Sequence, residues 1–386
     1  MSKRPKLLFY FLHLLGVGHV HRAKRLIDGF HTAGIDTNII YGGDPLPGIE
    51  FPGCSVCYLP PIRAADSTYQ NYLDQDGKPL EKAYLDLRQD KLIKFVQDQT
   101  PDVVLVEAFP FGRRMVRHEL RAMFDELAIR STPPLVVTSV RDILQKRKKP
   151  QRYEETVGTI QKYISKVLVH SDPEIIPLGE TFPLASRIAD KIEYTGFVLP
   201  PSTTGSTEPA DFDVLVSAGG GAFGGDLMKT CLQTASHFPG QTWCLLTGPN
   251  LSAIERERLK QTAPTNVTVK ERVDDLAAWM SKSRVSISQC GYNTAMDVLS
   301  IHHKSRCRAI FVPFDTQGQT EQLHRARLLA KAGFAINLPQ SQLDATALKL
   351  AVDQAMKLPA SPIHPDLSGV ETTASTILNW LGERHG

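Results

Sequence analysis

The 386-residue chain has no long apolar run, little excess charge and only six cysteines. A membrane-spanning helix needs about 20 consecutive apolar residues, so none is expected. A formal net charge of +3 is too small to attract nucleic acid, and we expect no nucleic-acid partner. The pair Cys54 and Cys57 lacks a second pair and a neighbouring histidine. We therefore expect neither a structural zinc site nor disulfide bonds.

The motif of ATP hydrolysis is also incomplete. Residues 217–225 contain five glycines within seven positions and follow an apolar segment, which predicts a loop with several free backbone N–H groups. The loop lacks the Gly-Lys-Ser/Thr ending of a P-loop, so ATP hydrolysis is not indicated. A flexible strand-helix connection is the alternative. Asp274 and Asp275 are adjacent at a predicted helix start, and we assign them no metal.

The N-terminus combines basic residues with an apolar stretch, as a signal peptide does. No small-residue cleavage site follows, and the continuous apolar run at 6–12 is typical of a strand buried on both faces. We therefore expect a cytoplasmic protein. A Gly-x-Gly turn follows, and then a helix with apolar residues at helical spacing. The third glycine of the dinucleotide fingerprint is missing, so a dinucleotide is only weakly supported.

His19 stands at the start of this helix and is a candidate general base. The positive end of a helix favours the neutral imidazole, which can accept a proton. General-base catalysis near neutral pH needs that form. His13 at the strand end and His21 two positions on are the nearby competitors, and His21 is expected to face elsewhere. The alternative is a histidine that only caps the helix or packs.

The most informative stretch is 284–332, which predicts strand, glycine turn, helix, strand, loop and helix. A helix that begins at a glycine turn favours a phosphate, because free N–H groups and the helix dipole point at it. Gly291 allows close approach. Asn293 and Thr294 add donors, and Asp297 lies one turn later on the same face, where it can accept hydrogen bonds from a ribose diol. An ordinary strand-helix-strand unit is the alternative.

This block resembles the donor-binding half of nucleotide-sugar glycosyltransferases with the GT-B fold. It is similar to the group that contains the lipid-linked N-acetylglucosaminyltransferase of peptidoglycan synthesis and the plant UDP-glycosyltransferases. The resemblance rests on the run 290–294 (CGYNT), the acid four residues after Asn293, Pro313-Phe314 and the pair Glu321-Gln322. The ribose-binding acid of the family is usually Glu, whereas this chain has Asp297.

The resemblance implies a fold of two Rossmann-like, doubly wound α/β domains that face a central cleft. It implies that His19 is the base and that Glu107, at the end of a buried strand, orients it; the alternatives for Glu107 are a helix cap or direct binding of an acceptor hydroxyl. It also implies a donor site that no metal or cofactor completes. The donor-binding residues implied are Ser217, Gly219, Gly220, Gly221, Val273, Gly291, Asn293, Thr294, Asp297, Glu321 and Gln322.

Composition along the chain divides it near residue 200. We expect an acceptor-side domain at 1–200, a proline-rich linker at 201–210, a donor-binding domain at 211–370, and a final helix at 371–386. In the resembling fold that helix crosses back onto the N-terminal domain. Strands alternate with helices in both halves, which favours a parallel sheet in each.

Two further stretches carry weaker signals. The polar segment 64–79 has no apolar period, and we expect a mobile loop on the acceptor side. The basic stretch 141–152 suits contact with an anionic membrane at the inner face, and a solvated loop is the alternative.

Taken with the resemblance, the sequence indicates an inverting hexosyltransferase. It would move a sugar from a nucleotide-sugar donor, with UDP as the expected nucleotide, to an unknown acceptor hydroxyl that is lipid-linked or belongs to polysaccharide synthesis. Two alternatives stay open. A non-hydrolysing sugar-nucleotide epimerase shares the fold, and a non-catalytic nucleotide-sugar-binding protein would bind the donor without turnover.

Overall fold

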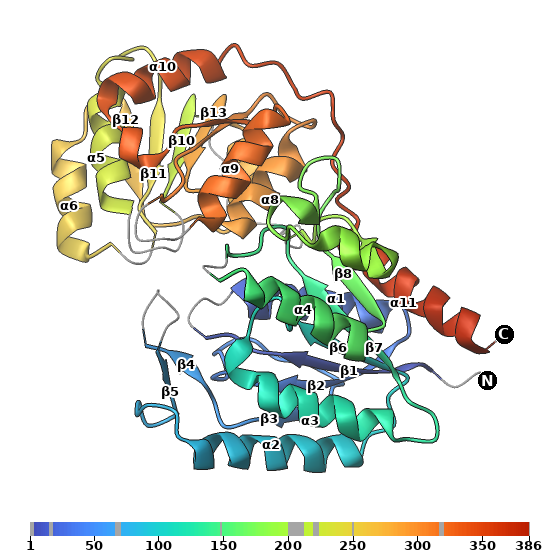
Figure 1. Cartoon of the computed structure of the whole chain (residues 1–386). Coiled ribbons are helices and arrows are strands. Elements are labelled where there is room, and N and C mark those ends of the chain that lie inside the picture. Colours follow the sequence, from blue (N-terminus) through green and yellow to red (C-terminus); the bar gives the residue numbers. More distant parts are fainter. Residues whose placement is uncertain are drawn as a thin grey trace. The chain divides into compact units, whose positions relative to one another are not determined.

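A computed structural model describes residues 4–14, 18–65, 71–146, 149–199, 212–218, 224–248, 251–315 and 320–385. The chain forms two compact units (Figure 1). Unit 1 comprises Met1–Val198 together with Ser368–Gly386, and unit 2 comprises Leu199–Leu367. The linker expected at 201–210 lies outside the described residues.

The core of unit 1 is a seven-stranded sheet in which every pair of neighbours is parallel. Its strands carry long runs of buried Val, Ile, Leu and Phe, as a sheet covered on both faces requires. In spatial order the strands are β3 (Val56–Tyr58), β2 (Asp36–Tyr41), β1 (Lys6–Phe11), β6 (Val103–Glu107), β7 (Leu135–Val140), β8 (Lys166–Val169) and β9 (Ile192–Tyr194).

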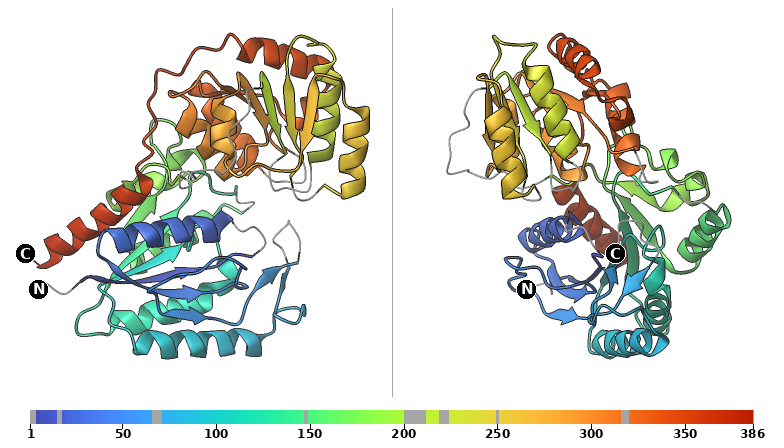
Figure 2. Two further views of the ribbon diagram at one scale, coloured as in Figure 1. Left: turned by 180° about the vertical axis from the view of Figure 1, so that it is seen from behind. Right: turned by 90° about the vertical axis from the view of Figure 1, so that its left-hand side faces the viewer.

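Helices cover both faces of this sheet (Figure 2). On one face, α2 (Lys82–Gln97), α3 (Arg117–Ala128) and α4 (Gln151–Tyr163) bury apolar side chains against the strands. On the other face lie α1 (Gly18–Thr32) and α11 (Gly369–His385), which contact each other (Figure 1).

The contact between α1 and α11 is close and apolar. Ala374, Ile377 and Leu381 of α11 join the core cluster that includes the buried face of α1. A Cβ atom added at Gly29 of α1 would overlap the side chain of Val370, so this crossing needs glycine. The segment that follows unit 2 in sequence therefore completes the core of unit 1.

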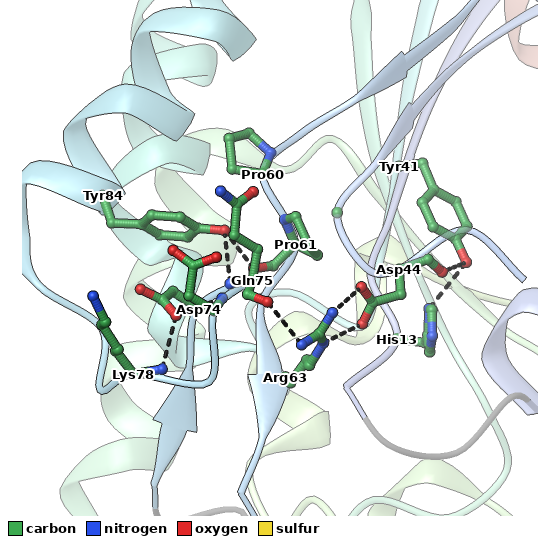
Figure 3. A network of polar contacts seen from close by, with 12 residues as sticks. His13, Tyr41, Asp44, Pro60, Pro61, Arg63, Asp74, Gln75, Lys78 and Tyr84 are labelled. Carbon is green, nitrogen blue, oxygen red and sulfur yellow. Dashed lines mark hydrogen bonds and ion pairs between the residues drawn. The ribbon is translucent and has the colours of Figure 1, made fainter.

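The polar segment 64–79, in which we expect a mobile loop, is described at residues 64–65 and 71–79. There it contributes to the short antiparallel pair β4 (Arg63–Ala64) and β5 (Tyr72–Leu73). Figure 3 shows Arg63 held between the carboxylate of Asp44, at 2.6 and 2.7 Å, and the carbonyl oxygen of Gln75, at 3.0 Å. These contacts anchor a polar sequence that has no apolar period, and residues 66–70 lie outside the described part.

Unit 2 has a six-stranded sheet whose neighbouring strands are also all parallel. Its helices are α5 (Gly224–Ala235), α6 (Ala253–Thr262), α7 (Leu276–Ser281), α8 (Tyr292–Ile301), α9 (Glu321–Lys331) and α10 (Ala345–Ala355). The strands in spatial order are β12 (Val267–Lys270), β11 (Trp243–Leu246), β10 (Val214–Ser217), β13 (Val285–Ser288), β14 (Arg308–Phe311) and β15 (Ala335–Asn337).

Both sheets reverse their strand order at one point, between β1 and β6 in unit 1 and between β10 and β13 in unit 2. Ligands of open parallel sheets bind outside the carboxyl ends of the strands at such a switch point. Glu107 ends β6, and Ser217 ends β10. Glu107 and Ser217 therefore lie at strand ends beside the switch point of their own sheet, the position at which folds of this kind bind ligands. Among the described residues, no helix is both long and apolar enough to cross a bilayer.

Candidate active site

The first turn of α1 brings His19 to the end of β6. The Nδ1 atom of His19 lies 3.0 Å from Oε1 of Glu107, within hydrogen-bond distance. The Glu107 side chain is 1% exposed, whereas the His19 side chain is 22% exposed. A buried carboxylate thus holds one ring nitrogen of an imidazole that still reaches solvent. This arrangement fixes the tautomer in which Nε2 can accept a proton.

Arg22 lies almost one turn after His19 on α1, and its side chain is fully buried. Its Nη2 atom donates a hydrogen bond to Oε1 of Glu107, the same oxygen that contacts His19. Among the described residues, Oε2 of Glu107 and the Nε and Nη1 atoms of Arg22 have no hydrogen-bond partner. No sequence motif points to Arg22, although it is a basic residue on an otherwise apolar helix face.

Charges around the pair set both protonation states. Burial alone raises the pKa of Glu107, but the adjacent His19 and Arg22 bring its net pKa well below the usual value. Burial, together with the charges of Arg113 and Arg141, lowers the pKa of His19 to about 4 against the opposing effect of Glu107. Near pH 7 the carboxylate is therefore ionised and the imidazole is neutral, as a general base must be.

The turn that follows Glu107 has an unusual backbone. Ala108 has φ of 63° and Arg113 has φ of 56°, a left-handed region that residues with a Cβ seldom adopt. The N–H of Gly112 donates to the carbonyl oxygen of Ala108 at 2.6 Å and closes the turn. Strained backbone of this kind clusters at functional sites, which agrees with a functional role for the end of β6.

The other histidines of this unit have different surroundings. His21 is exposed, and His13 is buried at the end of β1, where its Nδ1 lies 3.1 Å from the hydroxyl of Tyr41 (Figure 3). His170, just after β8, is fully buried, and its Nδ1 lies 2.8 Å from the hydroxyl of Thr195. Burial and the charge of Arg22 hold the pKa of His170 well below its usual value. His170 was not identified from the sequence.

In unit 2, Gly291 is the N-cap of α8, and a Cβ added there would meet nothing within 4 Å. Among the described residues, no atom therefore crowds the Cβ side of this position. Asn293, Thr294 and Asp297 occupy the first two turns of α8 and are half-buried. The structure thus places them at the positive end of a helix that follows the switch-point strand β13, where an anion is favoured.

A buried arginine joins this turn to the start of α9. Arg325 is fully buried, and its Nη1 donates to the carbonyl oxygen of Cys290 at 2.9 Å. Its Nη2 donates to Oε1 of Glu321 at 2.8 Å, and its guanidinium lies 5.7 Å from the ring centroid of Tyr292. One guanidinium therefore contacts both predicted halves of the donor site. No sequence motif points to Arg325.

The remaining predicted donor residues are less closely connected. Gln322 accepts a hydrogen bond from the N–H of Phe314 at 3.4 Å, and Ser217 is buried at the end of β10 beside β13. Val273 is half-buried, and Asp275 caps α7 by accepting from the N–H of Ala278 at 2.9 Å. The last three predicted residues, Gly219, Gly220 and Gly221, lie outside the described residues.

A carboxylate that caps a helix is committed to the backbone, so Asp275 is a poor metal ligand. Within the described ranges, no cluster of three or more His, Cys, Asp or Glu side chains is arranged to hold a metal ion. In the described part of unit 2, the start of α8 is suited to an anion, and Arg325 bonds to the carbonyl oxygen of Cys290 next to it.

Comparison with protein families shows that residues 219–368 match the glycosyltransferase family 28 C-terminal domain. A search of curated protein sequences finds no match. Among solved structures, the chain is similar to the glycosyltransferase of kitacinnamycin, with a TM-score of 0.67, 15% identity, and coverage of 98% of this chain and 100% of that one. MurG of Acinetobacter baumannii gives a TM-score of 0.64 at 15% identity, covering 97% of this chain and 100% of that one.

UGT2 of Phytolacca americana, solved with UDP-2fluoro-glucose and pterostilbene, gives a TM-score of 0.57 at 11% identity, covering 98% of this chain and 100% of that one. At these identities the likeness establishes the fold, and the family 28 domain adds the activity. Since the domain belongs to glycosyltransferases and the likeness extends over both units, the chain is a glycosyltransferase of the GT-B fold that takes its sugar from a nucleotide-sugar donor.

Proposed function

We propose that the enzyme transfers a hexose from a UDP-sugar to an acceptor hydroxyl with inversion at the anomeric carbon, and that His19 is the general base. The observation that carries this proposal is the 3.0 Å contact between Nδ1 of His19 and the buried carboxylate of Glu107. His19 takes the proton from the acceptor hydroxyl as that oxygen attacks the anomeric carbon and the bond to the diphosphate breaks. Glu107 then stabilises the imidazolium that forms.

Unit 2 is proposed to hold the donor. The diphosphate lies at the start of α8, near Gly291, Asn293 and Thr294, where backbone N–H groups and the helix dipole favour negative charge. Asp297 accepts hydrogen bonds from the ribose hydroxyls, and the backbone around Val273 contacts the base. The other proposed contacts of the diphosphate and sugar come from Ser217, Gly219, Gly220, Gly221, Glu321 and Gln322.

The pair Glu321 and Gln322 is suited to a sugar with neighbouring hydroxyls. Arg325 donates to Oε1 of Glu321 and so holds this carboxylate, a group that accepts hydrogen bonds, at the start of α9. The side-chain oxygen of Gln322 accepts from Phe314, so its amide NH₂ is the group that can donate. An acceptor beside a donor recognises two adjacent hydroxyl groups.

The departing diphosphate is proposed to need no metal. The start of α8 supplies partial positive charge, and the buried guanidinium of Arg325 lies directly behind it, bonded to Cys290. Fixed charge of this kind stabilises a leaving group without reorganisation during the reaction. Full activity in EDTA supports the proposal, and loss that Mg²⁺ restores would contradict it.

The location and acceptor are proposals of the same kind. We propose a cytoplasmic enzyme whose acceptor is lipid-linked or part of polysaccharide synthesis. Exposed Lys146, Lys149 and Arg152 support contact with an anionic membrane. Co-sedimentation with phosphatidylglycerol vesicles, and none with phosphatidylcholine vesicles, would support this contact. Equal binding to both would argue against it.

The test of function begins with a panel of nucleotide sugars in a thermal-shift assay. A donor that binds the folded state selectively raises the melting temperature. The stabilising donor is then incubated with the enzyme, with and without a set of hydroxyl acceptors, and the products are analysed. Transfer that depends on acceptor supports the proposal.

Two results would favour the alternative functions. An epimerised sugar nucleotide formed from the donor alone would identify an epimerase. Donor binding without any product, unchanged when His19 is replaced, would identify a binding protein. The anomeric configuration of a transferred sugar, read by NMR, decides between inversion and retention.

A further inference from the structure

Two buried arginines of unit 1 have contrasting surroundings. Arg88 donates to both carboxylate oxygens of Glu119, at 3.0 and 2.9 Å, and to the carbonyl oxygens of Gly42 and Pro60. It is a fully bonded structural group. Arg22 is equally buried, yet its one described hydrogen bond goes to Oε1 of Glu107. The guanidinium of Arg22 therefore places a positive charge next to Glu107, and in the described structure it does not connect other parts of the fold.

This charge falls on the atom that also contacts His19. Arg22 and His19 both approach Oε1, so they compete for the role of cationic partner to a single buried carboxylate. A buried anion needs a positive partner, since an unpaired one is strongly destabilised. Arg22 is always protonated and fills that role at every pH at which the protein is folded. His19 is then not required to carry a proton.

We propose that Arg22 is a positioning residue that neutralises Glu107 in place of His19, and so leaves the imidazole free to act as a neutral proton acceptor. The inference rests on the proposed function of His19 as base. It differs from a simple His-carboxylate pair, in which the carboxylate attracts a proton onto the ring before the substrate arrives.

The other charged groups around the pair act in the same direction. Arg113, after β6, and Arg141, after β7, both oppose a proton on His19. His170, after β8, is buried beside the charges of Arg22 and Glu107, and burial holds it neutral. Among the described residues, Glu107 is the group near His19 that favours protonation. Removal of Arg22 takes away the cation bonded to that carboxylate, and a proton on His19 becomes its replacement.

The test is an NMR titration of the protein labelled with ¹³C at the histidine rings, which needs no substrate. The His19 signal is assigned by its loss in His19→Gln. In Arg22→Met, the titration midpoint of His19 is expected to rise by about 1–3 pH units, because the negative charge of Glu107 is no longer neutralised by Arg22. Arg22→Lys keeps the charge and should leave the midpoint near that of the wild type. Arg88→Met, the matched buried control, should leave it unchanged.

If Arg22→Met folds poorly, the same substitution can be tested in the Glu107→Gln variant. In Glu107→Gln/Arg22→Met no buried carboxylate is left unpaired. Its His19 midpoint should match that of Glu107→Gln alone, because Arg22 acts through Glu107. An unchanged midpoint in Arg22→Met, or an equal rise in both backgrounds, would overturn the inference. Kinetics of His19→Ala separately test the proposed function: full activity there would remove His19 as base whatever the titration shows.

Discussion

The guanidinium of Arg325 donates a hydrogen bond of 2.9 Å to the carbonyl oxygen of Cys290, 35 residues earlier in the chain. Cys290 immediately precedes the Gly291 turn, and the same guanidinium holds Glu321 at the start of α9. The proposed phosphate-binding and sugar-binding segments are thus fixed to one rigid, buried side chain. Five N–H donors in a planar fork suit arginine to this task.

Replacement of Arg325 should therefore weaken donor binding without any direct contact to the donor being removed. In Arg325→Met, both Glu321 and the carbonyl oxygen of Cys290 lose the hydrogen bond that Arg325 donates. We expect donor affinity to fall by about 1.5–3 kcal/mol, the range for hydrogen bonds to charged groups. Calorimetry with the stabilising nucleotide sugar measures the change. Arg327→Met, at an exposed position of α9, is the control, and equal affinity in both variants would contradict the prediction.

Asp297→Ala should also weaken donor binding, by about 1.5–3 kcal/mol, because a carboxylate that accepts from the ribose is lost. The fold should survive, since Asp297 is half-buried on α8 and lies outside the apolar core. Calorimetry gives the affinity and a melting curve reports the fold. Glu257→Ala, an exposed acid on α6, should change neither. Wild-type affinity in Asp297→Ala would remove this residue from the site.

His19→Ala should lower turnover by about 10²–10⁴-fold, the usual contribution of a general base. Donor affinity should stay nearly constant, because the proposed donor contacts belong to unit 2. His21→Ala, at an exposed position two residues after His19, is the matched control and should do much less. Steady-state kinetics with the identified donor and acceptor measure both. If His21→Ala were inactive and His19→Ala active, the base would be His21 and the assignment to His19 would be wrong.

Glu107→Gln should give an effect between those two variants. The amide keeps the shape and a hydrogen bond to His19 but loses the charge that stabilises the imidazolium. Glu107→Ala should in addition lower the free energy of unfolding by about 3–5 kcal/mol, since it leaves Arg22 as an unpaired buried charge. Urea unfolding separates the two effects. Full activity in Glu107→Gln would mean that the carboxylate does not assist His19.

The stability of unit 2 should fall in acid because of His302. This side chain is buried, and its Nε2 accepts a hydrogen bond of 2.9 Å from the N–H of Ser361, which only the neutral ring can do. Burial, with the charges of Arg308 and His303, lowers the folded-state pKa of His302 to about 4. The unfolded chain has the ordinary value of about 6.5 and binds the proton first. The stability from the neutral ring is thus present above pH 6.5 and is lost between about pH 6.5 and 4.

A shift of this size corresponds to about 3 kcal/mol at most. His302→Gln should remove this part of the pH dependence, whereas His237→Gln, at an exposed position after α5, should keep it. Urea unfolding between pH 7.5 and 4.5, followed by the fluorescence of Trp243 and Trp279 in unit 2, measures the change. Parallel pH profiles of the wild type and His302→Gln would contradict the prediction.

The sequence predicted the fold class correctly, because long apolar strands and glycine turns are local signals. The strand expected at 6–12 is β1 (Lys6–Phe11), and the described part of 284–332 has the expected order of strand, helix, strand and helix. Short strands at sheet edges were not predicted, because β3 and β15 have three residues each, which is too few for a periodic pattern. The pair β4 and β5 lies in a polar segment that is held by contacts such as that of Arg63 with Asp44. These two residues are 19 positions apart, and a contact of this kind produces no periodic pattern in the sequence.

The candidate site shows the same limit. Residues that bind through a turn motif, such as Gly291 and Asp297, could be proposed from spacing alone. Arg22 and Arg325 could not, because a buried arginine and an exposed one look alike in sequence. What distinguishes them is the carboxylate that each meets: Glu107 lies 85 positions from Arg22. A charged residue on the apolar face of a helix indicates that it has a buried partner, but only the structure shows which residue that partner is.

The packing of α11 against α1 inverts the order in which the two units can be completed on the ribosome. Domains generally fold from the N-terminus as they are synthesised. Here the side chains of Ala374, Ile377 and Leu381 cover the core of unit 1 but leave the ribosome after all of unit 2. Unit 2 can therefore finish folding while the apolar face around α1 is still uncovered. The core of unit 1 is therefore complete only after α11 has been synthesised. This core includes the buried face of α1, the helix that carries the proposed base.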